Sequence, residues 1–321
     1  MKKRNLLFAY IIVLSLLSGE PFPALFPIRQ GFRYGVIDST GKIMLKPQLD
    51  MIDDFSEGMA VMRIGNQWGY IDGQEWQVLK TNFDQVGRFS EGKARVLYKE
   101  KWGYIDRKGK FVIRPQFEFA GDFKEGKAAV GIGGKVGYID STGKFIISPQ
   151  FPSTFNFSEG RAGVLVGNKL GYIDSTGKVV IKPIFDFIWD FREGLARVMV
   201  NKKWGYIDRN GKFVIKPRFD EGFDFSESLA AVRVQEKVGY IDKKGKFVIK
   251  PKFKSCGDFS EGLAPALADS LWGYIDKSGE FKIQPSFEVA YPFFRGLARV
   301  QMKGKIGYID KRGNFIWEPT E

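Results

Sequence analysis

The stretch "KWGYIDRKGKFVIRPQF", Lys101–Phe117, decides the fold, because the chain repeats it with small changes from end to end. It returns as "KWGYIDRNGKFVIKPRF" from Lys203 and as "KVGYIDKKGKFVIKPKF" from Lys237. Its glycine recurs at one constant interval, at Gly35, Gly69, Gly103, Gly137, Gly171, Gly205, Gly239, Gly273 and Gly307. Nine copies without an insertion indicate a repeat architecture, in which each unit is stabilised by its neighbours.

The residues inside each repeat predict β-strands, although some helical arrays repeat with the same period, about 34 residues. The segments "GYI" and "FVI" are β-branched and aromatic, alternate with a period of two, and are bordered by glycine or proline. We therefore predict an all-β fold built from antiparallel strands.

The Asp-x-x-Gly-Lys unit, Asp106–Lys110 in the third repeat, is typical of a tight hairpin turn. The Asp106 carboxylate can accept backbone N–H bonds, and Gly109 supplies the positive φ that the turn needs. In the second repeat Glu75 replaces this glycine, so we expect a different turn there. The aspartates given this structural turn role are Asp38, Asp72, Asp106, Asp140, Asp174, Asp208, Asp242, Asp276 and Asp310. Because each turn offers one carboxylate where calcium needs several oxygen ligands, we predict no metal and no cofactor.

Each repeat is predicted to hold three strands in an antiparallel meander, at Trp102–Asp106, Phe111–Pro115 and Lys127–Gly131 in one copy. Three strands leave the chain pointing the wrong way for an identical copy, so residues 117–126 must cross back. Alternation places the Ile113 column in the core, and this column is apolar in all nine copies.

One repeat alone should not fold, so neighbouring copies must stack. It buries about five large side chains, worth roughly 10 kcal/mol, against about 1–2 kcal/mol per residue for ordering the backbone. Both ends of the array carry a complete three-strand unit, which leaves no strand to be shared by ring closure. We therefore favour tandem repeats stacked as an open or superhelical solenoid, with a closed propeller-like ring as the alternative.

The composition limits the chemistry open to the chain. Its 321 residues carry a formal net charge of +13, no histidine and one cysteine, Cys256. The lack of histidine removes the commonest general base and the commonest metal ligand, and no disulfide can form within the chain. We interpret Cys256, in "FKSCGDF", as a packing residue, with a free reactive thiol as the alternative.

Residues 1–19 are predicted to be a signal peptide. Lys2, Lys3 and Arg4 precede the apolar run Leu6–Leu17, which is too short to span a bilayer comfortably. An uncleaved N-terminal membrane anchor is the alternative. Residues 20–25 are then a short linker, and residues 26–321 form one domain of nine repeats. We expect the protein to be exported, to the periplasm, the cell surface or the medium.

Two further columns were weighed as candidate sites. The glutamates of "SEG" and its variants could pair with aspartates as acid and base, but identical copies with no unique member fit turn chemistry better. They are Glu57, Glu91, Glu125, Glu159, Glu193, Glu227 and Glu261. The tryptophan column is predicted to pack between repeats, with exposed ledges for sugar stacking as the alternative; it holds Trp68, Trp102, Trp204 and Trp272. We predict no catalytic residue and no enzymatic activity.

Two columns of basic residues are the candidate binding surface. Alternation makes them face solvent, and stacking makes them two basic ladders: Lys42, Lys110, Lys144, Lys178, Lys212 and Lys246, and Lys46, Lys80, Arg114, Lys182, Lys216 and Lys250. Both fade at the C-terminal end, to Glu280 and Glu318. A solvated edge that discourages aggregation between strands is one interpretation, and a strip that binds an anionic polymer or an acidic protein is the other.

At "KWGYIDRKGKFVIRPQFEFAGDFKEGKAAV" the chain resembles the WG-repeat, or KWG-repeat, family of bacterial proteins. The resemblance covers nearly everything after the predicted signal peptide, with Val136, Leu170, Val238 and Ile306 replacing tryptophan, Ser228 replacing glycine and Arg295 replacing glutamate. It implies an all-β repeat protein that is often exported or surface-linked, and it carries no catalytic residue over to this chain.

These observations predict a non-enzymatic, exported protein that offers an extended surface for binding. The first hypothesis is a scaffold for protein–protein or envelope interaction. The alternative is a binder of anionic or sugar polymers through the basic and aromatic ladders, and a hydrolase is the least favoured. Nucleic acid is disfavoured as a partner, and a membrane is expected to be contacted only through an uncleaved N-terminal segment.

Overall fold

The computed structural model describes residues 22–319, whose regular elements are all β-strands. The predicted signal peptide therefore lies outside the described residues. Among residues 22–319, no helix is long and apolar enough to cross a membrane. The chain forms two compact units: the first runs to Lys99 and includes Gly103–Pro115, and the second comprises Glu100–Trp102 and the chain from Gln116 onward.

The first three sheets contain β1 to β11. Their bounds are β1 Leu25–Gln30, β2 Arg33–Asp38, β3 Ile43–Leu49, β4 Met51–Ile52, β5 Met59–Ile64, β6 Gln67–Asp72, β7 Val78–Lys80, β8 Gln85–Ser90, β9 Lys93–Tyr98, β10 Lys101–Ile105 and β11 Phe111–Phe117.

The remaining six sheets contain β12 to β35, all in the second unit. Their bounds are β12 Phe119–Ala120, β13 Ala128–Ile132, β14 Lys135–Ile139, β15 Phe145–Phe151, β16 Thr154–Ser158, β17 Arg161–Val166, β18 Lys169–Ile173, β19 Val179–Phe185, β20 Phe187–Ile188, β21 Leu195–Val200, β22 Lys203–Asp208, β23 Phe213–Phe219, β24 Glu221–Gly222, β25 Ala230–Val234, β26 Lys237–Ile241, β27 Phe247–Phe253, β28 Ser255–Cys256, β29 Ala264–Leu267, β30 Trp272–Ile275, β31 Phe281–Phe287, β32 Val289–Ala290, β33 Ala298–Met302, β34 Lys305–Ile309 and β35 Phe315–Trp317.

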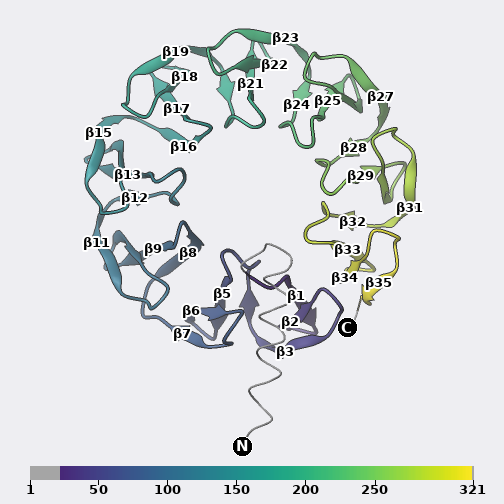
Figure 1. Cartoon of the computed structure of the whole chain (residues 1–321), viewed down its shortest axis with the longest axis horizontal. Coiled ribbons are helices and arrows are strands. Elements are labelled where there is room, and N and C mark those ends of the chain that lie inside the picture. The colour runs from purple at the N-terminus through teal and green to yellow at the C-terminus, as the bar shows by residue number, and fades with distance from the viewer. Residues whose placement is uncertain (1–21, 320–321) are drawn as a thin grey trace, which may run out of the picture. The chain divides into compact units, whose positions relative to one another are not determined.

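Each of these sheets is an antiparallel meander that follows the chain. The fourth has the order β12-β13-β14-β15, and every sheet after the three-stranded first one repeats this four-stranded pattern within the described residues. In the second unit the sheets follow one another round an arc, with β16, β24 and β32 on its concave side and β15, β19, β23, β27 and β31 on its convex side (Figure 1). We call each sheet a blade and number the blades 1 to 9, because four-stranded antiparallel sheets set side by side in this way are the blades of a β-propeller.

The prediction of an all-β fold is confirmed. The repeats have the propeller arrangement that was the alternative prediction, and the favoured solenoid is not confirmed. The reason lies in the link between repeats, which we expected only to cross back. It does cross from the outer strand of one blade to the inner strand of the next, but it also contributes a short fourth strand, such as β20. In a four-stranded blade the outer strand runs antiparallel to the inner strand, so the chain finishes at the end of the blade where it began and the link has only to cross to the inner edge of the next blade.

Within the second unit, a buried tyrosine joins each blade to the one that follows it. Tyr206 of β22 packs edge-on against Phe225 of the following blade, with ring centroids 5.1 Å apart, and its hydroxyl donates to the Phe223 carbonyl at 2.8 Å. The same pair of contacts recurs one repeat later, where Tyr240 packs on Phe259 and donates to the Gly257 carbonyl. In both units the hydrophobic clusters accordingly draw their members from two successive blades.

The glycine of the repeated phrase is required by a close approach of backbone. A Cβ built on Gly205 would lie 2.6 Å from the Ile215 carbonyl oxygen and 2.6 Å from the Pro217 nitrogen. The outer strand has a register shift beside this residue, which brings its backbone over the glycine. The repeated Trp-Gly pair therefore follows from packing within the blade.

Candidate functional site

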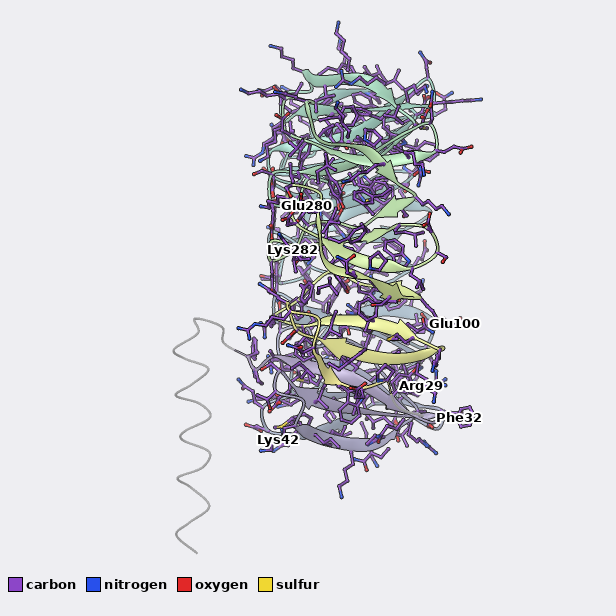
Figure 2. The ribbon with its side chains drawn as sticks, turned by 90° about the vertical axis from the view of Figure 1, so that its right-hand side faces the viewer. Arg29, Phe32, Lys42, Glu100, Glu280 and Lys282 are labelled. Carbon is purple, nitrogen blue, oxygen red and sulfur yellow. The ribbon has the colours of Figure 1, made fainter. Side chains whose placement is uncertain are left out.

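The predicted basic ladders lie on the outer strands, or at the turns that lead into them, and their side chains are exposed. This holds for all eleven residues assigned to the binding surface: Lys42, Lys46, Lys110, Arg114, Lys144, Lys178, Lys182, Lys212, Lys216, Lys246 and Lys250. Figure 2 shows Lys42 at one end of the first blade, with Arg29 and Phe32 at the other. In the eighth blade the equivalent turn position is Glu280, at the end that also carries Lys282 (Figure 2).

Three neighbouring blades carry the full set of outer lysines, and we call their surface the basic band. It consists of Lys178 and Lys182 at β19, Lys212 and Lys216 at β23, and Lys246 and Lys250 at β27. An exposed valine stands between the two lysines of each pair, at Val180, Val214 and Val248. Two lysines four positions apart on a strand are separated by about 13 Å.

The ammonium groups of the basic band have no partner among the described residues, neither an ion pair nor a hydrogen bond. Other lysines of the second unit differ. Lys203 lies 2.5 Å from Asp220, and Lys243 lies 3.1 Å from Glu193. Lys169, Lys277 and Lys311 are also ion-paired. The band is therefore a run of positive charge that forms no ion pair within residues 22–319.

The repeated aspartates lie in the hairpin turns. In all nine copies the carboxylate accepts the N–H of the residue two positions later, at 2.7–2.9 Å. In the second repeat the turn is one residue longer, because Asp72 N donates to the Gln77 carbonyl and Trp76, not residue 75, takes the positive φ. Among residues 22–319 no group of three or more His, Cys, Asp or Glu side chains is placed to hold a metal ion.

The glutamates of the "SEG" segment link successive blades. Glu159 accepts the N–H of Gly194 in the next blade at 2.9 Å and is held by Arg209 at 2.8 Å. Glu193 makes the same contacts with the Ser228 N–H and with Lys243. These carboxylates therefore cap the turn of the neighbouring blade.

The tryptophan column and Cys256 belong to the packing between blades. Trp68, Trp204 and Trp272 are half-buried against the clusters between blades. Cys256 is buried in the cluster of blades 7 and 8, and burial raises the pKa of its thiol to about 12. A thiol that stays protonated in this way is a poor nucleophile.

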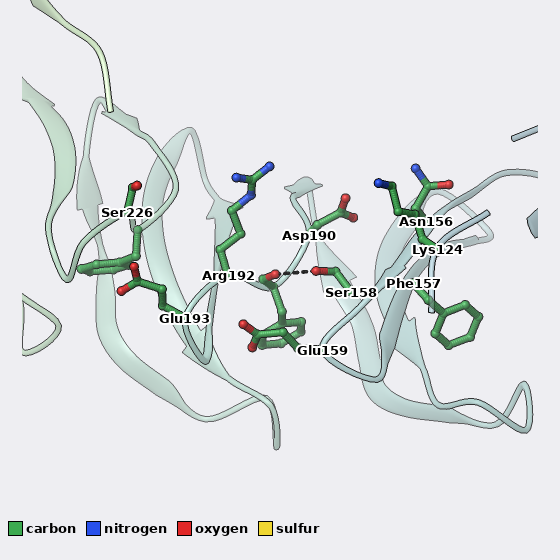
Figure 3. Close-up of a pocket in the computed structure, with 11 residues that line it drawn as sticks. Lys124, Asn156, Phe157, Ser158, Glu159, Asp190, Arg192, Glu193 and Ser226 are labelled. Carbon is green, nitrogen blue, oxygen red and sulfur yellow. Dashed lines mark hydrogen bonds between the residues drawn. The ribbon is translucent and has the colours of Figure 1, made fainter. Parts of the chain in front are cut away.

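A cavity of about 460 Å³, which the sequence analysis missed, opens at the inner edge of the second unit. Its polar lining includes Lys124, Asn156, Asp190 and Arg192, from the links that lead into successive blades. In Figure 3 these four side chains extend to one side of the cavity, whereas Glu159 and Glu193 lie on the other. Ser158 donates to the Phe191 carbonyl at 2.7 Å, shown as the dashed line, and so fixes the spacing of two links. We call this site the inner pocket.

Comparison with known proteins gives a family and a fold. The profile of the family described as "WG containing repeat" matches residues 34–68, 68–102, 102–135, 137–169, 171–204, 204–237, 239–271 and 272–305. No curated protein sequence matches the chain.

Among solved structures, one described as the crystal structure of the eukaryotic initiation factor aligns at 12% identity with a TM-score of 0.65. The alignment covers 91% of this chain and 95% of that one, so the two share a fold. Two others are more distant. The dihydro-heme d1 dehydrogenase NirN aligns at 12% identity with a TM-score of 0.48, over 92% of this chain and 72% of its own. Hsv2p of Kluyveromyces lactis aligns at 11% identity with a TM-score of 0.43, over 78% and 92%.

Proposed function

Because the chain belongs to the family of WG-containing repeats, we propose that it is a non-enzymatic binding scaffold that works outside the cytoplasm and docks on an anionic polymer of the cell envelope through the basic band. The observation that carries the proposal is the set of six exposed, unpartnered lysines on β19, β23 and β27. Three regularly repeated pairs of charges suit an extended partner with regularly spaced anionic groups, because many weak contacts then add.

The absence of a catalytic role is supported by how the repeated carboxylates are used. The glutamates accept backbone N–H groups and pair with cations, as Glu159 does with Gly194 and Arg209. The aspartates cap their own turns. A general acid and base pair instead needs two carboxyl groups that are free to exchange protons and have different environments.

Export is supported by the sequence of residues 1–19, with its basic start and apolar core. Mass spectrometry of the N-terminus of the cell-derived protein tests this part. We expect an N-terminus near residue 20, and an intact Met1 in a cytosolic fraction would contradict it.

The experiment on the basic band compares two variants of similar charge. In the first, the six lysines of the band are changed to glutamine. In the control, five paired lysines, Lys169, Lys203, Lys243, Lys277 and Lys311, are changed to glutamine. Binding is measured to envelope polymer immobilised from extract, and to dextran sulfate as a defined polyanion.

We expect the band variant to lose at least about tenfold in affinity, or about 1.4 kcal/mol. The control should change by less than about threefold, and wild-type binding should fall steeply as salt is raised, since exposed charges are screened. Equal losses in both variants would contradict the proposal. So would binding to extract that disappears after protease digestion, because the partner would then be a protein.

A further inference from the structure

The inner edge of the second unit is where the strict repeat breaks down. The position just before the phenylalanine of "FSEG" holds an aspartate in four links of this unit, Asp122, Asp190, Asp224 and Asp258, but Asn156 and Pro292 in the other two. The position before that holds Phe155, Trp189, Phe223, Gly257 and Tyr291. The repeated serine that follows the phenylalanine is replaced by Lys124, by Arg192 and, in the last blade, by Phe294. These differences place Lys124, Asn156 and Arg192, each of which departs from its column, around the inner pocket together with the repeated Asp190.

The charges at the inner pocket are interleaved and balanced, unlike those of the basic band. Arg192 lies 3.4 Å from Asp224, and Arg197 lies 2.8 Å from the other oxygen of the same carboxylate. Burial, and next the charge of Asp224, raise the pKa of Asp190. Glu159 and Glu193 are already occupied by turn N–H groups and cations. Neither sign of charge prevails, which disfavours a polyanion and suits a neutral ligand that both accepts and donates hydrogen bonds.

An exposed aromatic ring is linked to this polar set through Arg197 and Asp224, the latter 3.4 Å from Arg192. Trp189, adjacent in the chain to Asp190, is 45% exposed. The guanidinium of Arg197 lies 4.3 Å from its ring centroid and is itself fixed by donating to the Gly222 carbonyl at 2.5 Å. Phe187, two positions before Trp189, is also exposed. A ring held in place by a cation is rigid before any ligand binds, and its π face attracts the slightly positive C–H groups of a sugar ring.

We infer that the inner pocket, with Trp189 beside it, is a binding site for a neutral saccharide. Trp189 stacks on a sugar ring, Asp190 and Asn156 accept hydrogen bonds from its hydroxyl groups, and Arg192 and Lys124 donate to them. A cavity of about 460 Å³ is within the usual size of small-ligand sites and holds a short segment of a glycan chain. The inference goes beyond the proposed function, because the basic band lies on the outer strands and this site lies at the inner edge.

The experiment titrates the purified chain with cellohexaose, chitohexaose, polygalacturonate and a zwitterionic hexapeptide, followed by calorimetry and tryptophan fluorescence. We expect at least one neutral hexasaccharide to bind, with an affinity that changes by less than about twofold between about 50 and 500 mM salt. Trp189→Ala and Asp190→Asn should each weaken it by about tenfold or more, and Trp189→Phe should retain most of the binding.

A matched control separates the site from a general loss of structure. Tyr291→Ala removes another exposed ring stacked on an arginine, Arg299 at 4.2 Å, in a blade where Pro292 replaces the aspartate. It should leave saccharide binding unchanged, and so should the variant with six glutamines in the basic band, whatever its effect on polyanions. Binding to polygalacturonate or the peptide alone, no binding to either hexasaccharide, or equal effects of Tyr291→Ala and Trp189→Ala would overturn the inference.

Discussion

The outer strands and the inner edge of the second unit follow the same repeat with very different strictness. At β19, β23 and β27 every blade presents lysine, valine and lysine in the same order. At the inner edge of the same three blades, Trp189, Phe223 and Gly257 occupy one position. The outer strands end each sheet and have an edge without a strand partner, where lysine and proline stand in all three of these blades. The inner links vary more from copy to copy, and Asn156, Trp189 and Arg192 each occur once in their columns.

The column of buried tyrosines between blades, which includes Tyr206, varies less from repeat to repeat than either surface. We expect substitutions in this column to cause the largest losses of stability. Tyr206→Ala should reduce the free energy of unfolding by about 3–5 kcal/mol, because a buried ring is lost from a cluster shared by two blades. Tyr206→Phe should reduce it by about 1–2 kcal/mol, since only the bond to the Phe223 carbonyl is removed. The control Val214→Ala, on the outer face, should stay within about 0.5 kcal/mol. Urea unfolding measures all three, and a Tyr206→Ala value near that of Val214→Ala would refute the role of the column.

Gly205→Ala should cause the next largest loss in the free energy of unfolding. Its Cβ would meet the backbone of the outer strand at Ile215 and Pro217, which has no flexible end to move aside. We expect a loss of about 1–3 kcal/mol by urea unfolding, in the range found for overpacked sites. Ser148→Ala, at an exposed position of an outer strand, is the control. Full stability of Gly205→Ala would show that the strand can shift at little cost.

On the outer strands, the lysine pair at the centre of the basic band should contribute more to polyanion binding than an isolated lysine pair outside the band. Lys212→Gln with Lys216→Gln should weaken binding to dextran sulfate by about threefold to tenfold, because lysine pairs flank them on both sides. Lys42→Gln with Lys46→Gln should have less than about a twofold effect, since the next blade lacks the first lysine of the pair. Equal effects measured by salt elution would mean that net charge alone governs binding.

At the inner edge, a pH profile distinguishes two kinds of aspartate. Burial, and next the charge of Asp224, raise the pKa of Asp190 above the value of about 3.9 for an aspartate in an unfolded chain, so the ionised carboxylate reduces the free energy of unfolding at pH 7. Asp190→Asn should therefore raise the free energy of unfolding at pH 7, and the gain should shrink as the pH falls toward about 4.

Asp186→Asn should do the opposite. The hydrogen bond from Lys169, followed by the Asn201 N–H, lowers the pKa of Asp186, so its stabilisation is present at neutral pH and is lost as the pH falls below the unfolded value. Thermal unfolding from about pH 4 to 7 checks both variants. The same sign of change in the two would contradict the assignment.

The sequence predicted the parts that repeat, because nine copies reveal each column. The turn at Asp106 and the buried Ile113 column follow from residue type and alternation alone. It did not predict the fourth strand, since a segment as short as Phe187–Ile188 cannot show alternation. The choice of propeller over solenoid depends on that strand.

The inner pocket was missed for a related reason. Lys124, Asn156, Asp190 and Arg192 come from links in successive repeats, and only the fold brings these links together. The available signal was the replacement of the repeated serine by Lys124 and Arg192, which breaks the column at two of the lining positions.

The central claim is that one packed array carries two independent binding surfaces, and a crossed binding experiment tests it most directly. The variant with six glutamines in the basic band and the Trp189→Ala variant are each titrated with dextran sulfate and with the neutral hexasaccharide that binds best. We predict that each variant loses at least about tenfold in affinity for its own ligand and less than about twofold for the other. Loss of both ligands in either variant would contradict the claim, because the two surfaces would then be one site or a single folding unit disturbed by either change.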